Sequence, residues 1–499
     1  MENIKPETSP KQGTIKEKSI AKNSVYYSIY QALNVIFPFL TGMYVARILL
    51  PDAVGQVAYA SNIATYFVIL AYLGIPTYGV REIAKVRNNI EERSKVYSEL
   101  MVINSISTCI FYAIYILLIL FVPSFRKQLQ LYLITGLSIA LNALNNAWLY
   151  EGLELFRFIS IRNITFKALS FLILIITVRG PENYLAYASI TVIGTAGNYA
   201  LNMAYSPKFV KFSPHNLNLR RHLKSILLLV VVNLAIELYS LVDVTMLGAM
   251  STNKNVAYYS YASRINKIFI QVINAFTIVI VPRIAFYYKE GRKDDFNRLL
   301  SKTLETIFVI GIPLVAGIQI CASDAIELIY SSAFLPSANV LRILAWVLII
   351  SPVGYLLGSR VLLVTDHENK MVLCVGIGAI VNVIGNTILI PRYVEYGAAI
   401  ASVLSEIVVM VIYDHYGRNY FTISGEGKNV LKIVASSAAM GMYLFIIDIL
   451  LTGNNNLDIF LRLLVQVIGA CVIYFSLLYI LKEPMTRMYG VRISNKLKR

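Results

Sequence analysis

The chain has 499 residues, of which 57% are apolar and only 15% are charged, and its mean hydropathy is +0.63. A soluble protein carries about 25% charged residues, so this chain has too little polar surface to dissolve in water. Its formal net charge is +17, but the cations lie in short loops between apolar stretches, a distribution that argues against a nucleic-acid partner.

From residue 23 onward the sequence is a succession of apolar stretches, each long enough to cross a hydrocarbon layer of about 30 Å. We predict an all-α polytopic membrane protein with about fourteen transmembrane helices. Their predicted bounds, in chain order, are 24–48, 56–80, 100–122, 128–149, 158–178, 184–205, 225–250, 256–281, 303–322, 338–364, 371–390, 396–416, 430–451 and 459–481.

The spans and loops divide the chain into six predicted regions. These are a polar cytoplasmic tail (1–22), a six-helix lobe (23–206), a basic cytoplasmic linker (207–224), a second six-helix lobe (225–418), two extra helices (419–482) and a basic cytoplasmic tail (483–499). The tripeptide Val-Ala-Tyr recurs at 57–59 and 256–258, at the start of the second span of each lobe. This repeat favours the two-lobe layout that transporters use to move around a central site.

The distribution of Lys and Arg predicts the orientation of the chain. They crowd into both tails and into the loops 81–99, 207–224 and 282–302, whereas the alternate loops hold few. Because cytoplasmic loops carry the excess of cations, both termini are expected to be cytoplasmic. The external loops are too short to fold as catalytic domains, and no Gly-rich phosphate loop is present. We therefore expect neither an enzyme, nor a built-in ATP motor, nor a cofactor.

An ionised side chain inside a span costs at least about 2.5 kcal/mol unless it meets a partner or water. Six cations lie well inside the predicted spans: Arg162, Lys167, Arg264, Lys267, Arg342 and Arg360. Arg162 and Lys167 lie on the fifth span, and the first six spans hold no acid at comparable depth. Arg162 could still extend to the cytoplasmic interface. Arg264 and Lys267 are three residues apart and share one helix face. We predict that the four cations Arg162, Lys167, Arg264 and Lys267 bind an anionic group.

Three acids, Glu237, Asp243 and Glu406, are candidates for coupling the protein to a proton or sodium gradient. The rise of a helix places Asp243 at the depth of Arg264. It places Glu237 at the depth of Lys267. Two interhelical salt bridges are therefore an equally good interpretation, and Glu406 could pair with an arginine in the same way.

Other polar residues of the spans are expected to have structural roles. Asparagines such as Asn34, Asn382 and Asn386 are expected to join helices through hydrogen bonds. The four cysteines are far apart in apolar segments, and no two of the four histidines have ligand spacing on a helix. The sequence therefore predicts neither a disulfide nor a metal site.

Four stretches carry a resemblance to a known family. They are PFLTGMYVARILLPDAVGQVAYASNIATYFVILAYLGIPTYGVREIAKVR (38–87), WLYEGLELF (148–156), LVDVTMLGAMSTNKNVAYYSYASRI (241–265) and NVIGNTILIPRYVEYGAAIASVLSE (382–406). Over nearly its whole length the chain resembles bacterial oligosaccharide flippases of the polysaccharide transporter family. That family belongs to the multidrug/oligosaccharidyl-lipid/polysaccharide flippase superfamily.

The resemblance implies two six-helix lobes arranged in a V, with two further helices outside. It implies that undecaprenyl-pyrophosphate-linked oligosaccharide moves from the inner to the outer leaflet of the bacterial plasma membrane, by alternating access, for cell-surface polysaccharide. The partners that it implies are this lipid-linked substrate, membrane lipid, and the polysaccharide polymerase and chain-length machinery. A diphosphate needs a cationic path, which suits the four cations. The resemblance supports such a path in general without fixing each position.

Three other functions stay open at this point. Multidrug exporters share the scaffold but usually handle cations through acids buried in a lobe. Lipid II flippases carry a cargo that also bears a pyrophosphate. A non-transporting scaffold of a polysaccharide-assembly complex would use all its buried charges as structural pairs. Leaflet-specific labelling of lipid-linked sugar discriminates the carriers from the scaffold.

Overall fold

The computed structural model describes residues 20–215, 217–278, 280–422, 427–453, 455–484 and 486, and the regular elements within these residues are all helical. The chain divides into two compact units. Unit 1 comprises Met1–Thr41 and Ala60–Leu234, and unit 2 comprises Gly42–Tyr59 and Ala235–Arg499. Nine helical segments of the described residues are long and apolar enough to cross a membrane. The predicted all-α polytopic fold is therefore confirmed.

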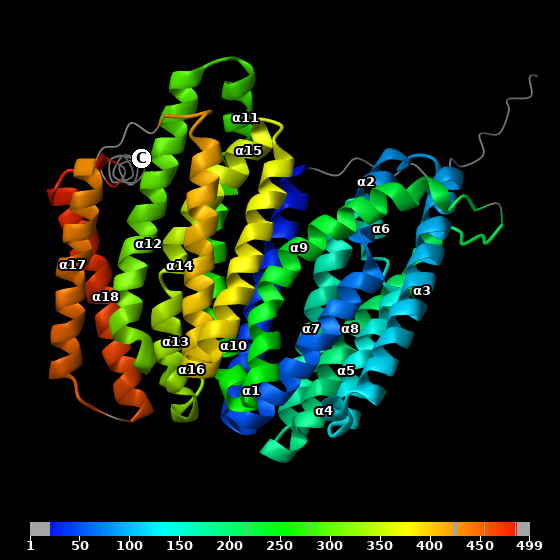
Figure 1. Cartoon of the computed structure of the whole chain (residues 1–499), viewed down its shortest axis with the longest axis horizontal. Coiled ribbons are helices and arrows are strands. Elements are labelled where there is room, and N and C mark those ends of the chain that lie inside the picture. Colours follow the sequence, from blue (N-terminus) through cyan, green and yellow to red (C-terminus); the bar gives the residue numbers. More distant parts are fainter. Residues whose placement is uncertain are drawn as a thin grey trace, which may run out of the picture. The chain divides into compact units, whose positions relative to one another are not determined.

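Unit 1 contains most of the first helix and the helices that follow it (Figure 1). In chain order these are α1 (Ile20–Tyr72), α2 (Ile75–Lys85), α3 (Ile90–Phe121), α4 (Pro123–Arg126), α5 (Leu129–Leu141), η1 (Asn142–Leu144), α6 (Ala147–Gly152), α7 (Phe156–Thr177), η2 (Pro181–Asn183), α8 (Tyr184–Tyr205) and η3 (Ser206–Lys208). Helix α8 packs against both α5 and α7. The core of the unit includes the fully buried rings of Tyr97, Trp148 and Tyr150.

Unit 2 contains the remaining helices and the tip of α1. In chain order the helices are α9 (Arg220–Met250, shared with unit 1), α10 (Asn253–Ile278), α11 (Val281–Lys289), α12 (Lys293–Ile329), η4 (Ser332–Phe334), α13 (Pro336–Leu344), α14 (Val347–Gly354), η5 (Tyr355–Arg360), α15 (Val361–Val364), α16 (Glu368–Gly417), α17 (Gly427–Leu450) and α18 (Asn456–Ile480). Helices α17 and α18, which correspond to the predicted extra pair, pack on each other and on α12 (Figure 1).

Two long helices each consist of two helical arms that meet at one non-helical residue. In α1 this residue is Leu50, with φ of 61°, and in α16 it is Val394, with φ of 52°. Pro51 disfavours a helical conformation at the preceding Leu50, and Pro391 lies just before Val394. Left-handed backbone is costly for branched side chains, so packing of the arms has to maintain both bends.

The predicted spans lie on helices of the structure. The first arm of α1 and each arm of α16 carry one predicted span, and the spans that fall outside the nine long apolar segments lie on α5, α8 and α9. The predicted span 56–80 is divided between the second arm of α1 and α2, with Leu73 at a φ of 53° between them. Two further spans are less regular than predicted. The span 128–149 is divided into α5, η1 and α6 at an asparagine-rich stretch, whose side chains compete with the backbone for hydrogen bonds.

The third irregular span is 338–364, which is divided into α13, α14, the π-helical segment η5, and α15. A close approach to α16 accompanies this irregularity. A Cβ atom on Gly358 of η5 would lie 2.0 Å from Cγ of Tyr413. Only glycine fits there, and π-helical turns of this kind are often found at functional positions.

The described part of the linker 207–224 lies along the N-terminal part of α3. The Nε and Nη2 atoms of Arg93 donate to the carbonyl oxygen of Phe209 at 3.0 and 2.7 Å. The backbone N–H of Lys211 donates to Oγ of Ser94 at 2.9 Å. The linker is therefore held to unit 1 by side chains of α3.

The contact between the linker and α3 ends at Glu99, whose side chain is fully buried. Its carboxylate accepts hydrogen bonds from the backbone N–H of Asn218 at 2.8 Å and from Nε of Arg221 at 2.9 Å. The Nε2 atom of His222 lies 2.8 Å from the carboxylate, and the Nδ1 atom lies 2.8 Å from the hydroxyl of Tyr78. This buried acid thus has cationic and hydrogen-bonding partners from the start of α9.

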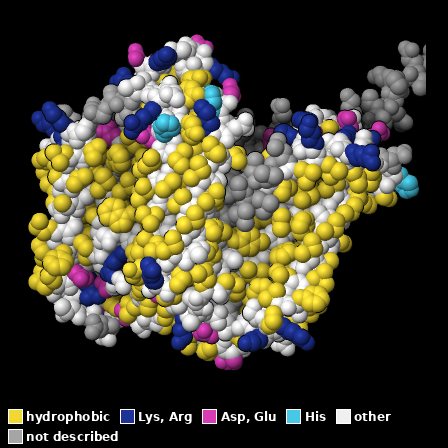
Figure 2. Space-filling view, in the orientation of Figure 1, with side chains coloured by type: hydrophobic (Ala, Val, Ile, Leu, Met, Phe, Trp, Pro, Cys, Tyr) yellow, Lys and Arg dark blue, Asp and Glu magenta, His cyan; other side chains and the backbone are white. Residues whose placement is uncertain are grey.

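Hydrophobic side chains cover the middle of the helices on the visible face of each unit, and most charged side chains lie towards the helix ends (Figure 2). On α18, for example, Leu464, Ile468, Val472 and Phe475 are exposed. Such a surface is suited to lipid and would aggregate in water. The protein is accordingly a multi-pass membrane protein. The predicted tails lie largely outside the described residues.

Candidate functional site

Lys167 lies in the middle of α7, about 16 Å from either end of the helix at 1.5 Å per residue. Its Nζ atom donates a hydrogen bond to Oδ1 of Asn34 on α1 at 2.6 Å. Nδ2 of Asn163 donates to the same oxygen at 3.0 Å. The lysine is therefore held by the oxygen of a neutral amide, which positions its charge without neutralising it.

Arg162 lies five residues before Lys167 on α7, and its side chain is buried. Its Nε atom donates to Oδ1 of Asn198 at 3.0 Å, and Nη1 donates to Oδ1 of Asn202, both on α8. The guanidinium is thus held inside unit 1, so Arg162 does not extend to the interface. We call the residues of these two networks the unit 1 cationic cluster: Asn34, Arg162, Asn163, Lys167, Asn198 and Asn202.

One acid interacts with this cluster, which corrects a prediction. The sequence places Glu151 after the end of the fourth span, and no counter-ion for Arg162 was expected. In the structure the charges of Glu151, on α6, and Arg162 interact. Burial raises the pKa of the Glu151 carboxyl, and the nearby Arg162 charge opposes that shift. Glu151 offsets part of the Arg162 charge.

The other two predicted cations lie on α10 in unit 2. The guanidinium of Arg264 lies over the ring of Tyr261, 5.0 Å from the centroid. A Cβ atom on Gly42 of α1 would lie 2.3 Å from Nη1 of Arg264, so glycine leaves the room that the guanidinium occupies. Lys267 is exposed, one turn further along the helix.

Asp243 on α9 is buried among neutral hydrogen-bond donors of unit 2. Its Oδ1 atom accepts from Nδ2 of Asn382 at 3.0 Å and from Nδ2 of Asn386 at 2.8 Å, both on the first arm of α16. Its Oδ2 atom accepts from Oγ of Ser402 at 2.7 Å and from the hydroxyl of Tyr259. We call these five residues the Asp243 cluster.

The hydrogen-bond partners of Asp243 bear on the salt bridge with Arg264 that the sequence analysis left open. Asp243 is held by two amides and two hydroxyls, so the predicted salt bridge with Arg264 is not the arrangement that the structure contains. The Oδ1 atom of Asn386 is buried and has no hydrogen-bond partner. The cluster therefore combines a carboxylate with a free amide oxygen, both acceptors. The side chain of Glu237, which was expected to pair with Lys267, lies outside the described part of the structure.

Glu406, on the second arm of α16, lines a cavity of about 250 Å³ in unit 2. Tyr355 and Ser359 of η5 and Tyr413 of α16 also line it. Arg342 and Arg360 are the span arginines that could pair with Glu406, and Arg342 is held at α12. Arg342 donates to the backbone oxygen of Gln319 at 2.9 Å.

The remaining charges of this region form local contacts. Arg360 lies over the ring of Tyr355, and Asp414 pairs with Arg418 at the end of α16 at 2.5 Å. In the described residues, no group of three or more His, Cys, Asp or Glu side chains is arranged to hold a metal ion.

Asparagines contribute more to these clusters than the sequence indicated. Asn382 and Asn386, expected only to join helices, both donate to one carboxylate. Their spacing of four residues inside an apolar span places them on one helix face. This spacing was the sequence signal that they could share one acceptor. Asn34 joins α1 to α7 as expected, but its partner Lys167 could not be predicted, because the contact depends on the packing of α7 against α1.

The helical fold and the polar clusters inside the membrane spans define a polytopic helical membrane protein. Among solved structures the chain is similar to a lipid II flippase in an inward closed conformation, with a TM-score of 0.68, 18% identity, and coverage of 92% of this chain and 99% of that one. It is also similar to an inward-facing multidrug transporter, with a TM-score of 0.61, 17% identity, and coverage of 80% of this chain and 97% of that one. At these identities the likeness concerns the fold.

The family model described as polysaccharide biosynthesis protein matches residues 20–287, and the chain belongs to this family of the flippase superfamily. A second model, for the lipid II flippase MurJ, matches residues 169–465. A low-salt glycan biosynthesis flippase of Haloferax volcanii is 26% identical over 45% of this chain and 47% of its own length. An O-antigen transporter of Escherichia coli K12 is 22% identical over 80% of this chain and 97% of its own length. The chain thus spans about half of the first relative and nearly all of the second.

Proposed function

We propose that the protein flips an undecaprenyl-pyrophosphate-linked oligosaccharide from the cytoplasmic to the outer leaflet of the bacterial plasma membrane by alternating access. The observation that carries this proposal is Lys167, a cation in the middle of a membrane span whose hydrogen-bond acceptor is a neutral amide. An ionised group at that depth is costly and is usually functional. The names of the family and of the two relatives, a glycan flippase and an O-antigen transporter, support a lipid-linked glycan as cargo.

The proposed cargo has an anionic head group and a polyprenyl tail, and the two parts need different surroundings. The candidate cations for the diphosphate, which prefers charge-assisted hydrogen bonds, are Arg162 and Lys167 in unit 1 and Arg264 and Lys267 in unit 2. The tail stays in lipid, against the apolar surfaces of the helices. Asparagines of the unit 1 cationic cluster fix the two cations of α7 in position, so that less entropy is lost when the head group binds.

We propose that an inward proton or sodium gradient drives the cycle, with Asp243 as the first candidate for the coupling site. A buried carboxylate with neutral partners can accept a proton or, together with the free oxygen of Asn386, coordinate a small cation. Glu406 in its cavity and Glu237 are further candidates. No cofactor is required in this scheme.

The same proposal covers location and partners. The relatives are transporters and flippases, so the protein acts as a carrier and not as an enzyme. Both termini face the cytoplasm, since the basic loops lie on that side of the predicted topology. The exported lipid-linked glycan would then pass to a polysaccharide polymerase and its chain-length machinery.

The test is a flipping assay in proteoliposomes that contain a lipid-linked oligosaccharide, with a membrane-impermeant reagent that labels sugar in the outer leaflet. Labelled sugar should accumulate with the protein and an imposed ion gradient, and should stay at the level of protein-free vesicles otherwise. Equal labelling with and without the protein would eliminate the carrier function and favour a scaffold.

Lipid II is the second candidate cargo, because the MurJ model matches residues 169–465. It shares the polyprenyl pyrophosphate and differs in the sugar-peptide head. The lipid-linked intermediate that accumulates on the cytoplasmic side when the gene is deleted identifies the cargo. Accumulation of lipid II with normal levels of other lipid-linked glycans would favour this alternative.

A further inference from the structure

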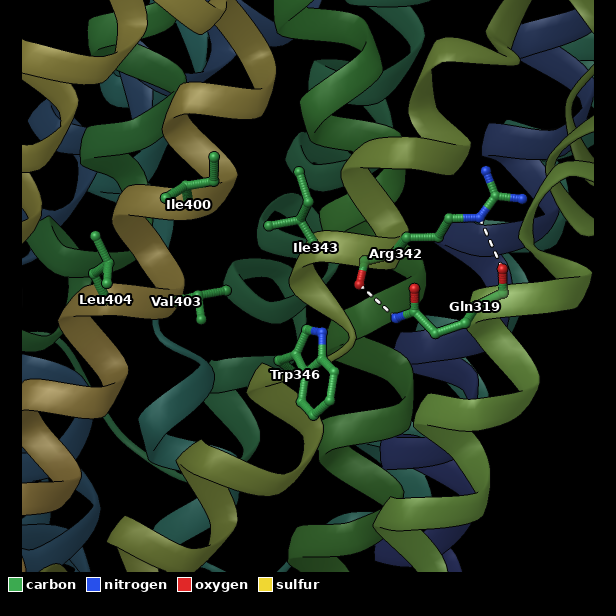
Figure 3. A pocket seen from close by; sticks show the side chains of 7 residues that line it. All are labelled: Gln319, Arg342, Ile343, Trp346, Ile400, Val403 and Leu404. Atoms are coloured by element: carbon green, nitrogen blue, oxygen red, sulfur yellow. Dashed lines mark hydrogen bonds between the residues drawn. The ribbon is translucent and has the colours of Figure 1, made fainter. Parts of the chain in front are cut away.

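A cleft of about 280 Å³ lies in unit 2 among α12, α13, the start of α14 and the second arm of α16 (Figure 3). Its apolar lining consists of Ile343, Trp346, Ile400, Val403 and Leu404. The three side chains from α16 lie across the cleft from α13, and Trp346 lies at one end (Figure 3). None of these residues belongs to the Asp243 cluster or to the Glu406 cavity.

The cleft opens to the membrane. Trp346 and Leu404 are 52% and 47% exposed, and such large side chains in a membrane span face hydrocarbon. The volume of the cleft is slightly below that of a typical small-molecule site. The cleft therefore fits part of a hydrocarbon chain better than a whole ligand. The apolar part of the occupant is therefore a section of a lipid chain.

Arg342 also lines the cleft, and its guanidinium is directed away from the α16 side chains and towards Gln319 of α12 (Figure 3). Its Nε atom donates to the backbone oxygen of Gln319 at 2.9 Å, and Nε2 of Gln319 donates back to the backbone oxygen of Arg342 at 2.9 Å (Figure 3). Nη1 donates to Oδ1 of Asn339 at 2.7 Å, and Nη2 donates to Oγ of Ser323 at 2.9 Å. All three acceptors are neutral, and two of the five guanidinium N–H groups stay available.

The order of these groups along the helices matches the order of groups in a lipid of the outer leaflet. In the predicted topology both α13 and the second arm of α16 enter the membrane from the external side. Asn339 and Arg342 therefore lie nearer the external surface than Trp346. The four residues from Arg342 to Trp346 correspond to about 6 Å along the helix axis. On the second arm of α16, Ile400 likewise lies nearer the external surface than Leu404. The charge lies at the depth of head groups and the apolar walls extend inward from it.

We propose that this cleft binds an anionic glycerophospholipid of the outer leaflet, with the phosphate at Arg342 and one acyl chain between α13 and α16. Charge complementarity selects an anionic head group, because Arg342 carries a charge that its neutral acceptors leave uncompensated. The site is distinct from the proposed cargo path. The lipid is a bound component of unit 2, and transport of a glycan is not needed for it to bind.

The test measures lipid binding by native mass spectrometry of the full-length, detergent-purified protein. Phosphatidylglycerol and phosphatidylcholine with the same acyl chains are titrated onto wild type and onto Arg342→Gln. We expect wild type to prefer phosphatidylglycerol, and Arg342→Gln to lower its affinity about tenfold with little change for phosphatidylcholine. Arg360→Gln is the matched control, since Arg360 is a span arginine of unit 2 outside the cleft, and it should behave as wild type.

Two further variants keep the proposal falsifiable should Arg342→Gln fail to fold. Arg342→Lys retains the charge and should retain the preference. Val403→Trp fills the cleft and should weaken binding of both lipids. An unchanged preference in Arg342→Gln, or unchanged binding in Val403→Trp, would overturn the proposal. Displacement of phosphatidylglycerol by an equimolar amount of undecaprenyl phosphate would also overturn it, because the cleft would then hold the cargo. Each result is independent of any transport assay.

Discussion

Glu99 in unit 1 and Asp243 in unit 2 are both buried acids of long helices, but they are held in opposite ways. Glu99 meets Arg221 and His222 as well as a backbone N–H. Asp243 meets only amides and hydroxyls among the contacts that the structure gives it. The paired acid fastens the linker to α3, and Asp243 instead joins α9 to both arms of α16 and to α10 through neutral groups.

The cations Arg462 and Lys167 also differ in whether their partner is charged or neutral. Arg462 on α18 forms a two-pronged ion pair with Asp324 on α12, at 2.5 and 2.6 Å, which joins the extra helices to unit 2. Lys167 is held by the oxygen of an asparagine. The Arg462–Asp324 pair therefore connects two elements, whereas the charge of Lys167 has a neutral acceptor. The predictions below test this distinction.

The largest effect is expected for Lys167→Ala. Removing the mid-span cation should lower glycan flipping by a factor of about ten to a hundred, since a hydrogen bond to a charged group contributes about 1.5–3 kcal/mol. Proteoliposome flipping at matched protein levels measures this loss. Arg157→Ala, at an exposed arginine near the start of the same helix, serves as the control, and Lys167→Arg should restore part of the activity. Full activity of Lys167→Ala would show that the charge has no role in transport.

Asp243→Asn is expected to remove the dependence of flipping on an ion gradient while leaving the fold intact. The amide can still accept hydrogen bonds but cannot bind a proton or carry a charge. Flipping should fall about tenfold and should no longer respond when the gradient is collapsed. Asp414→Asn, which breaks the exposed pair with Arg418, is the control. A variant that keeps the gradient response would place the coupling site elsewhere, with Glu406→Gln as the next variant.

A stability effect is expected for Gly55→Ala. A Cβ atom on Gly55 would lie 1.7 Å from the backbone oxygen of Asn253, so the tip of α1 would have to move away from α10. Overpacking of this kind costs about 1–3 kcal/mol, which a thermal unfolding curve detects. Gly317→Ala is the matched control, because its added Cβ meets nothing within 4 Å, and it should leave the melting temperature unchanged or raise it. Equal melting temperatures for the two variants would contradict the packing that we describe.

The smallest effect is expected for Glu99→Gln. Loss of the carboxylate charge should cost about 1–2 kcal/mol and should accelerate proteolysis in the linker 207–224. Glu82→Gln breaks surface pairs with Lys85 and Arg81 and should cost about 1 kcal/mol or less. If both variants resist protease equally, then Glu99 does not fasten the linker, and the contrast with Asp243 loses its basis.

The helical spans could be predicted because their length and composition depend on the membrane alone. Helix ends were less predictable. Helix α3 begins at Ile90, ten residues before the predicted span, with Asn89 capping its first turn. Charged residues mark where the membrane ends, and a capped helix can continue beyond that point into the cytoplasm.

The clusters could be predicted only in part, for a physical reason. Charge and depth selected Arg162, Lys167 and Asp243 as residues to examine. Their partners come from distant helices, as in the contact between Asn34 and Lys167, and depend on which helix faces pack together. The effect of Glu151 on Arg162 was missed because it depends on how α6 packs against α7, which periodicity does not reveal. The roles of the site residues stay predictions until the variants are measured.

The tip of α1, residues 42–59, packs within unit 2, whereas both arms around it belong largely to unit 1. Its contacts include Asn253 against Gly55, Tyr59 against Gly248, and a hydrogen bond from Arg47 to the backbone oxygen of Leu328. Because domains tend to fold in the order in which the ribosome makes them, this hairpin emerges long before its partners exist. This early segment is thus among the last to reach its final place. A chain cut in the linker 207–224 would leave the fragment that follows the cut without the tip of α1.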